Sequence, residues 1–376
     1  MHYKHDEIHP ENNPQYKGLN VNSGVKEVPS INPYKKIKHK RKHYSADEYL
    51  EGILAGNISM LGQAVTLVES SLPEHQKIAQ EVIVKCLPYA GKSIRLGITG
   101  VPGAGKSTFI EALGMHLIRN EHKLAVLAID PSSERSKGSI LGDKTRMEEL
   151  SVAKNAFIRP SPSAGSLGGV ARKTRESIIL CEAAGFDTIF VETVGVGQSE
   201  TSVHSMVDFF LLIQLAGTGD ELQGIKRGIM EMADGITINK ADGNNIEKAQ
   251  VARTQFQNAL HLFPLPESSW SPEVLTCSAV ENTGIAETWN MVERYVKFVK
   301  ENLYFGRKRN TQSKYWMYET INEQLKSNFY QNTEIKKILE QEEKRVLSNE
   351  ESSFIAAKKL LDYYFKPFQM SSEAII

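Results

Sequence analysis

The sequence predicts an α/β protein in which helices cover both faces of a mostly parallel sheet. Short apolar runs alternate with helical stretches between residues 92 and 300, a pattern typical of repeated β-α-β units. A glycine-rich loop at residues 100–107 joins one apolar run to the next helix. On each side of residues 92–300 the apolar residues follow a helical period and show no strand pattern. We therefore expect a helical subdomain before this region and a helical arm after it.

The N-terminal part of the chain divides into two expected segments. Residues 1–44 hold four prolines and a basic run from Lys35 to Lys42, which predicts a disordered or extended basic tail. Residues 45–90 carry apolar residues every three or four positions, which predicts an N-terminal helical subdomain. Asn57 is a good N-cap and Pro73 a good first helical residue, so we expect helices to begin there.

The remainder divides into the α/β domain, residues 91–302, and a helical arm, residues 303–376. We expect a helix from about Ile285 that closes the flank of the sheet, and further helices after Gly306. The helices of the arm have apolar faces, including Trp316, but no strands to cover. Such a face is buried either against a second subunit or on its own domain.

The glycine-rich loop fits the pattern G-x-x-x-x-G-K-[S/T] and lies between an expected strand, Ile94 to Thr99, and a helix. Glycines let the backbone wrap a polyphosphate closely, and the N–H groups of a helix start favour anions. Lys106 is expected to reach the β and γ phosphates, and Ser107 to ligate Mg²⁺. The predicted nucleotide-binding residues of this segment are Gly100, Val101, Pro102, Gly103, Ala104, Gly105, Lys106, Ser107 and Thr108.

Two later segments indicate that the base is guanine. A short apolar strand ends in Asn239-Lys240-Ala241-Asp242, the N-K-x-D element of P-loop GTPases. The Asp242 carboxylate can accept hydrogen bonds from guanine N1–H and the exocyclic amino group, a donor pair that adenine lacks. A second strand, Glu273 to Cys277, ends in Ser278-Ala279, which resembles the loop whose backbone N–H contacts guanine O6.

Carboxylates follow two further strands. Phe186 to Val191 predicts a buried strand followed by Glu192-Thr193-Val194-Gly195, where most small GTPases have D-x-x-G. Glu192 can hold a magnesium-bound water, and Gly195 can donate its N–H to the γ-phosphate. Asp130 follows the strand Leu124 to Ile129. Ligands of parallel sheets lie beyond the carboxyl ends of the strands, so we expect these groups to meet at one nucleotide.

These motifs make the chain similar to the MeaB/ArgK group of P-loop GTPases, which includes the protein linked to methylmalonic aciduria type A. The resemblance spans most of residues 48–300, and Glu192 through Glu200 together with the segment around Asp220 is its most specific part. The matching stretches are 97–103, 128–133, 140–147, 159–162, 165–170, 192–200 and 219–228.

The resemblance implies a GTP-hydrolysing chaperone for an adenosylcobalamin-dependent mutase, most often methylmalonyl-CoA mutase. Such proteins gate cofactor loading and protect or reactivate the mutase, and they are homodimers. Carried over by position, Asp130, Asp143 and Glu192 would surround Mg²⁺ and the hydrolytic water, beside Lys106. The switch segments would be residues 131–150, 193–203 and 217–228, and the residues that sense the partner would be Gln198, Asp220 and Lys226.

Efficient GTPases add an arginine to the charge clamp around the phosphates. Candidates near the expected loops are Arg135, Arg146, Arg159, Arg172 and Arg175. For each one taken singly, a surface or salt-bridging role is the better reading.

Composition excludes several other classes of protein. The formal net charge of zero argues against broad electrostatic binding to nucleic acid or membranes. The longest apolar run, Phe209 to Leu215, is far shorter than the roughly 20 residues that span a bilayer. The three cysteines, Cys86, Cys181 and Cys277, lack C-x-x-C spacing and are expected to be core residues in a reducing compartment, so we expect a cytoplasmic protein.

Two alternative functions stay open at this stage. A metal-insertion GTPase of the urease or hydrogenase type would need Cys or His ligands near the switches, where His204 is the one candidate. The N-terminal His2, His5 and His9 are a weaker signal for a metal. A nucleotide-dependent kinase linked to amino-acid transport would use ATP, against which Asp242 argues.

Overall fold

The computed structural model describes residues 44–129, 147–160, 167–193, 199–216 and 227–373. Within these ranges no helix is both long enough and apolar enough to cross a membrane. The expected tail, residues 1–44, therefore lies almost wholly outside the described residues.

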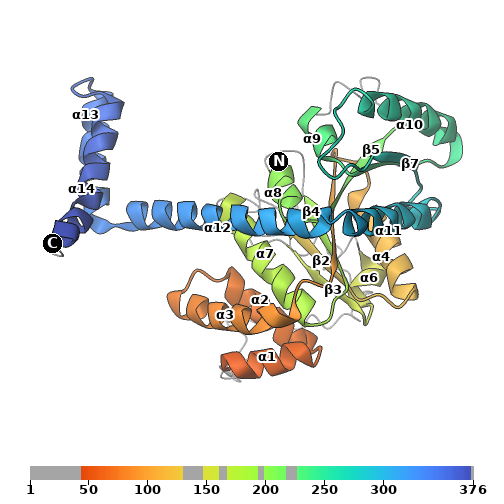
Figure 1. Ribbon diagram of the computed structural model, residues 1–376, viewed down its shortest axis with the longest axis horizontal. Coiled ribbons are helices and arrows are strands. Elements are labelled where there is room, and N and C mark those ends of the chain that lie inside the picture. Colours follow the sequence, from red (N-terminus) through yellow and green to blue (C-terminus); the bar gives the residue numbers. More distant parts are fainter. Residues whose placement is uncertain (1–43, 130–146, 161–166, 194–198, 217–226, 374–376) are drawn as a thin grey trace, which may run out of the picture. The chain divides into compact units, whose positions relative to one another are not determined.

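Seven parallel strands form a single sheet in the order β3-β2-β4-β1-β5-β6-β7 (Figure 1). The chain crosses repeatedly from one side of the sheet to the other, as the alternation of strands and helices predicts. The predicted α/β fold with a parallel sheet is thus confirmed. The strands are β1 (Ile94–Gly100), β2 (Leu124–Ile129), β3 (Ala156–Arg159), β4 (Thr188–Thr193), β5 (Phe209–Leu215), β6 (Gly235–Asn239) and β7 (Glu273–Thr276).

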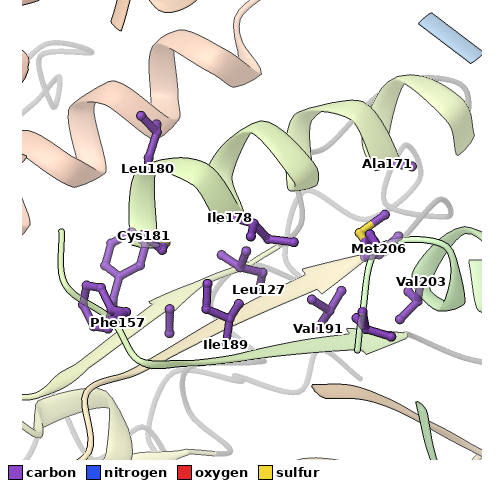
Figure 2. Packing of buried hydrophobic residues seen from close by; sticks show 14 of the residues in the cluster. Leu127, Phe157, Ala171, Ile178, Leu180, Cys181, Ile189, Val191, Val203 and Met206 are labelled. Atoms are coloured by element: carbon purple, nitrogen blue, oxygen red, sulfur yellow. The ribbon is translucent and has the colours of Figure 1, made fainter. Parts of the chain in front are cut away.

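Helices bury both faces of this sheet. Along β2, Leu124 and Val126 pack with α4 (Lys106–Arg119), α6 (Glu148–Val152) and α11 (Ile285–Glu301). The alternate residues Ala125, Leu127 and Ile129 belong to the opposite cluster, where Leu127 lies opposite Ile178 of α7 (Leu167–Ala183) in Figure 2. Strands buried on both faces read as continuous apolar runs, which explains why β2 has the bounds that its sequence predicts.

Three short helices precede the sheet and pack on α7: α1 (Ala46–Leu54), α2 (Ile58–Glu69) and α3 (Pro73–Cys86), followed by η3 (Leu87–Tyr89). Asn57 caps α2 by accepting hydrogen bonds from the amides of Ser59 and Met60. Pro73 is the first residue of α3. Helices therefore begin at both predicted positions, because the capping chemistry there is local. The other connecting elements are α8 (Ser199–His204), α9 (Arg227–Met232), η4 (Gly243–Asn245) and α10 (Ile246–Leu260).

The C-terminal helices are α12 (Tyr304–Gln331), α13 (Thr333–Leu347) and α14 (Ser353–Glu373). Further helices are expected after Gly306, but α12 already begins at Tyr304 and contains Gly306. The break between α11 and α12 falls at Leu303, whose φ of 63° ends one helix before the next begins. Trp316 is buried against the α/β region of its own chain, whereas several apolar side chains farther along are exposed, among them Ile321, Leu325 and Phe354.

Ion pairs fix the start of α12 to the edge of the sheet where the strands begin. The guanidinium of Arg309 donates to both carboxylate oxygens of Asp208, at 2.8 and 2.7 Å, and to the carbonyls of Gly91 and Ser93, at 2.6 and 2.7 Å. Next to it, the Lys308 ammonium donates to the carbonyl of Asp208 at 2.7 Å. The first turns of α12 are therefore part of the folded body.

Arg309→Met removes four of these bonds and leaves the nearly buried Asp208 carboxylate without its cation. We expect it to lower the free energy of unfolding by about 3–5 kcal/mol, measured by urea unfolding. Arg294→Met is the matched control, because Arg294 and Glu273 form an exposed pair that contributes about 1 kcal/mol or less. Equal losses in the two variants would contradict the anchoring role of Arg309.

His204, the last residue of α8, lies at this same edge, with its ring edge-on to Phe210 at 5.6 Å between centroids. Burial, with a smaller contribution from the charge of Lys308, lowers the pKa of His204 to about 4, and Asp234 opposes the shift. The side chain is thus neutral at pH 7. The unfolded chain, with a histidine pKa near 6.5, binds more protons between pH 6.5 and 4, so stability falls as the pH falls through that window.

His204→Gln removes this titration and should make the loss of stability between pH 7 and 5 smaller by about 1–2 kcal/mol. The measurement is urea unfolding at both pH values. His261→Gln, an exposed histidine, is the control and should keep the original pH dependence. The account of His204 fails if both variants respond to pH as the unaltered chain does.

Candidate functional site

The glycine-rich loop connects β1 to α4 at the carboxyl edge of the sheet. Gly105 has a φ of 80°, and a Cβ there would lie 2.8 Å from Nδ2 of Asn239. A Cβ on Gly100 would lie 2.3 Å from the carbonyl oxygen of Ile213 on the neighbouring strand. Glycine is therefore required at both positions for the loop to lie so close to β5 and β6.

Lys106 is the first residue of α4, and its ammonium donates to the carbonyl of Gly100 at 2.9 Å. Burial lowers the pKa of Lys106, and the carboxylates of Glu192 and Glu200 partly oppose that shift. A cation thus lies at the start of a 14-residue helix, where the helix dipole also favours an anion. Ser107 and Thr108 follow in the first turn of the same helix.

The side-chain amide of Asn239, at the end of β6, links the glycine-rich loop to the segment after β7. Its Nδ2 donates to the carbonyl of Ala104 at 2.8 Å, and its Oδ1 accepts from the amide of Ala279 at 3.2 Å. The Cys277 thiol also donates to Oδ1, at 3.4 Å. Asn239 is 1% exposed, so these bonds are shielded from water and hold the glycine-rich loop against the segment after β7.

Asp242 lies three residues beyond Asn239, and the Ser278 hydroxyl donates to its carboxylate. The amide of Glu281 in turn donates to the Ser278 hydroxyl at 3.1 Å. Lys240, with a φ of 60°, turns the chain between Asn239 and Asp242. The structure therefore brings the two predicted base-reading segments together, with the amide of Ala279 directed to Asn239.

Glu192 lies inside a strand, not after one as expected. Strand β4 continues to Thr193, because β4 is paired with β1 and β2 on its two sides and the ladder with β2 runs to Thr193. The side chain of Glu192 is 6% exposed, and its negative charge raises the pKa of Lys106 against the larger effect of burial. Beside it, the Thr193 hydroxyl donates to the Thr99 hydroxyl at 2.9 Å, which ties β4 to β1 just before the loop.

Several predicted site residues lie outside the described residues: Asp130, Asp143, Gly195, Gln198, Asp220 and Lys226. The same holds for the candidate arginines Arg135 and Arg146. Strand β2 ends at Ile129, directly before Asp130. In the part of the chain that the structure covers, no group of three or more His, Cys, Asp or Glu side chains could hold a metal ion.

Two candidate arginines make structural contacts. Arg159 forms an ion pair with Glu69 of α2. Arg175 donates to the carbonyl of Gln312 and the hydroxyl of Ser313, both at 3.0 Å. His204, considered as a metal ligand, lies at the edge of the sheet opposite the glycine-rich loop. Arg159 and Arg175 therefore have an ion pair and hydrogen bonds within the fold, and His204 packs against Phe210.

Two contributions to the site were missed at the level of the sequence. Glu200 is 1% exposed, and its charge raises the pKa of Lys106 against the larger effect of burial. In the sequence it stands out only as the last residue of the segment Glu192 through Glu200. Cys277, predicted as a core residue, is buried but also donates to Asn239. Neither role has a local sequence signal, because each depends on a contact between distant segments.

Comparisons with known proteins agree with this geometry. Residues 61–334 match the family described as methylmalonyl Co-A mutase-associated GTPase MeaB. The chain is 45% identical to GTPase ArgK of Escherichia coli, with 84% of this chain and 96% of the relative covered. It is 44% identical to the mitochondrial methylmalonic aciduria type A homolog of Mus musculus, with 84% and 78% covered.

A solved structure titled LAO/AO transport system kinase has a similar fold, with a TM-score of 0.68 and 39% identity. The match covers 85% of this chain and 97% of that one. The parallel sheet, the glycine-rich loop and the match to one family over most of the chain lead to one assignment. The chain belongs to the MeaB family of P-loop GTPases, and its reaction is the hydrolysis of a bound guanine nucleotide.

Proposed function

We propose that this GTPase uses GTP hydrolysis to gate cofactor loading into an adenosylcobalamin-dependent mutase, and to protect or reactivate that enzyme. Methylmalonyl-CoA mutase is the proposed partner. The observation that carries the proposal is the match over residues 61–334 to a family described by its association with that mutase. The relative in Mus musculus, named for methylmalonic aciduria, supports the same partner.

The proposed phosphate site consists of the backbone of residues 100–105, Lys106 and the first turn of α4. Lys106 would leave the carbonyl of Gly100 and pair with the β and γ phosphates. The hydroxyl of Ser107 and the buried carboxylate of Glu192 are oxygen donors of the kind that Mg²⁺ prefers, so these residues fit the ion. Together with Asp130 and Asp143 they would hold Mg²⁺, which supplies positive charge to the phosphates. Gly195 would donate to the γ-phosphate.

The proposed base site centres on Asp242. Its carboxylate would accept from guanine N1–H and the exocyclic amino group, while Ser278 keeps the carboxylate oriented. The backbone N–H of Ala279, which Asn239 holds in place, would also contact guanine O6. Lys240 would cover the base. A site built on acceptors in this way leaves the carboxylate without its two guanine donors when adenine is bound, which gives the selectivity.

We further propose that the switches signal to the mutase through Gln198, Asp220 and Lys226, and that the helical arm, residues 303–376, forms a homodimer. Exposed apolar side chains on the arm support the second proposal, since a second copy would remove them from water. They include Ile321, Leu325, Tyr330, Phe354 and Phe365.

A nucleotide-dependent kinase linked to transport is the second candidate, because the solved relative carries that title. Asp242 favours GTP over the ATP that such a kinase would use. Metal insertion, the third possibility, has no support from the described residues, which contain no suitable group of ligands.

Asp242→Asn should reduce the preference for GTP over ATP by about 10- to 100-fold, because one acceptor for the guanine donors becomes a mixed donor and acceptor. The measurement is competition between the two nucleotides for binding. Glu247→Gln, an exposed carboxylate nearby, is the control and should keep the original preference. An unchanged preference in Asp242→Asn would count against the base-reading role.

The proposed partner predicts that methylmalonyl-CoA mutase accelerates GTP turnover by the purified protein, by about 10²-fold or more if it completes the charge clamp. Turnover is measured alone, with the cofactor-free mutase and with the loaded mutase. Lys106→Ala should abolish turnover in all three, and the acceleration should depend on Asp220 and Lys226. Turnover that does not respond to the mutase would reject this partner and leave the GTPase assignment in place.

A further inference from the structure

Helix α8 connects the two edges of the sheet. In its first turn, Glu200 is almost fully buried, and its carboxylate acts on the ammonium of Lys106 at the phosphate loop. At its other end, His204 lies close to Lys308 and Asp234, where strand β6 begins. Six residues thus link the candidate phosphate site to the region where α12 is anchored.

The side of α8 that faces the sheet is closely packed. A Cβ on Gly97 of β1 would lie 2.9 Å from Cγ1 of Val203 and 2.9 Å from Cγ2 of Val207. Val203 also belongs to the buried cluster that contains Val191 of β4 (Figure 2). Gly97 is three residues before Gly100, so α8 is in direct contact with the strand that carries the phosphate loop.

Two side chains of α12 hold the C-terminal end of α8. Gln312 Nε2 donates to the carbonyls of Val207, at 2.8 Å, and His204, at 3.4 Å. The indole N–H of Trp316 donates to the carbonyl of Ser205 at 3.0 Å. Of these three carbonyls, that of His204 ends α8, where the last carbonyls have no partner within the helix, and those of Ser205 and Val207 lie in the segment between α8 and β5.

Helix α7 contacts the same part of α12. Arg175 donates to the carbonyl of Gln312 and to the hydroxyl of Ser313, both at 3.0 Å, and its guanidinium lies 5.7 Å from the centre of the Trp316 ring. Gln312 and Trp316 are 7% and 6% exposed. Beside the junction a pocket of about 660 Å³ is lined by His204, Tyr304, Arg307, Tyr315 and their neighbours. The end of α8 is therefore tightly packed on one side and has free space on the other.

We propose that Gln312 and Trp316 are positioning residues for GTP hydrolysis: they hold the end of α8 in place against β1, the strand that leads into the glycine-rich loop, and thereby fix the position of the buried Glu200 carboxylate on the same helix. The inference rests on the proposed role of Lys106. By this inference, a protein that binds the helical arm can change the rate of hydrolysis through the first turns of α12.

The test compares steady-state GTP turnover of the full chain with two variants that each lose the donor: the first nearly keeps the side-chain volume, and the second keeps an aromatic ring of smaller size. Gln312→Met and Trp316→Phe should each lower kcat about 3- to 10-fold, the equivalent of one neutral buried hydrogen bond, with less than a twofold change in KM. Gln324→Met is the matched control, because Gln324 on the same helix is exposed and donates to Asn328 at 3.0 Å, and its kcat should not change.

A double-mutant cycle separates positioning from simple support of the fold. Glu200→Gln should also lower kcat, and Glu200→Gln combined with Gln312→Met should be no slower than the slower single variant, because both act through one carboxylate. Multiplicative losses, or variants with lower thermal stability and unchanged kcat, would overturn the proposal. The assay contains no mutase, so a failed partner assignment leaves the result intact, whereas normal turnover in Lys106→Ala would overturn both the role of Lys106 and this inference.

Discussion

The arrangement of the nucleotide site depends on the buried amide of Asn239. One side chain at the end of β6 donates to the glycine-rich loop at Ala104 and accepts from the segment after β7 at Ala279. An amide is suited to this position because it offers a donor and an acceptor at once. Without it, the loop that would hold phosphates and the segment that would read the base have no direct polar link among the described contacts.

The two edges of the sheet have different physical roles. At the carboxyl edge, polar groups are held by hydrogen bonds to backbone and to one another, and Glu192 and Glu200 lie within the electrostatic reach of Lys106. At the opposite edge, the charges are neutralised within the fold, as in the pairing of Arg309 with Asp208. The proposed nucleotide chemistry thus belongs to one edge, and the other edge fixes α12 to the α/β region.

The sequence predicts the fold well because local signals and burial agree. Strands buried on both faces appear as apolar runs, and the signals that begin two helices, the N-cap Asn57 and the first helical residue Pro73, are local. The pattern does not reveal that β4 extends through Glu192, since its length is set by pairing with β1 and β2. Nor does it reveal that the first helix of the arm contains Gly306, because a glycine inside a helix carries a cost that neighbouring contacts can offset.

Only part of the candidate site can be predicted from the sequence. The motifs identify Lys106, Asn239 and Asp242 because each stands at a fixed distance from a strand end. The contacts of Glu200, Gln312 and Trp316 join segments more than 90 residues apart, and only the folded chain brings them together. The functional roles of the predicted site residues stay predictions, with geometry that is consistent with them.

The central claim is that a guanine nucleotide binds at the carboxyl edge of the sheet, between the glycine-rich loop and the segments after β6 and β7. Hydrogen exchange of the full chain, with and without GDP and Mg²⁺, tests this most directly. The account predicts slower exchange at residues 100–108, 239–242 and 278–279, with ADP giving little effect. Equal protection by ADP, or protection that leaves these three segments unchanged, would contradict it.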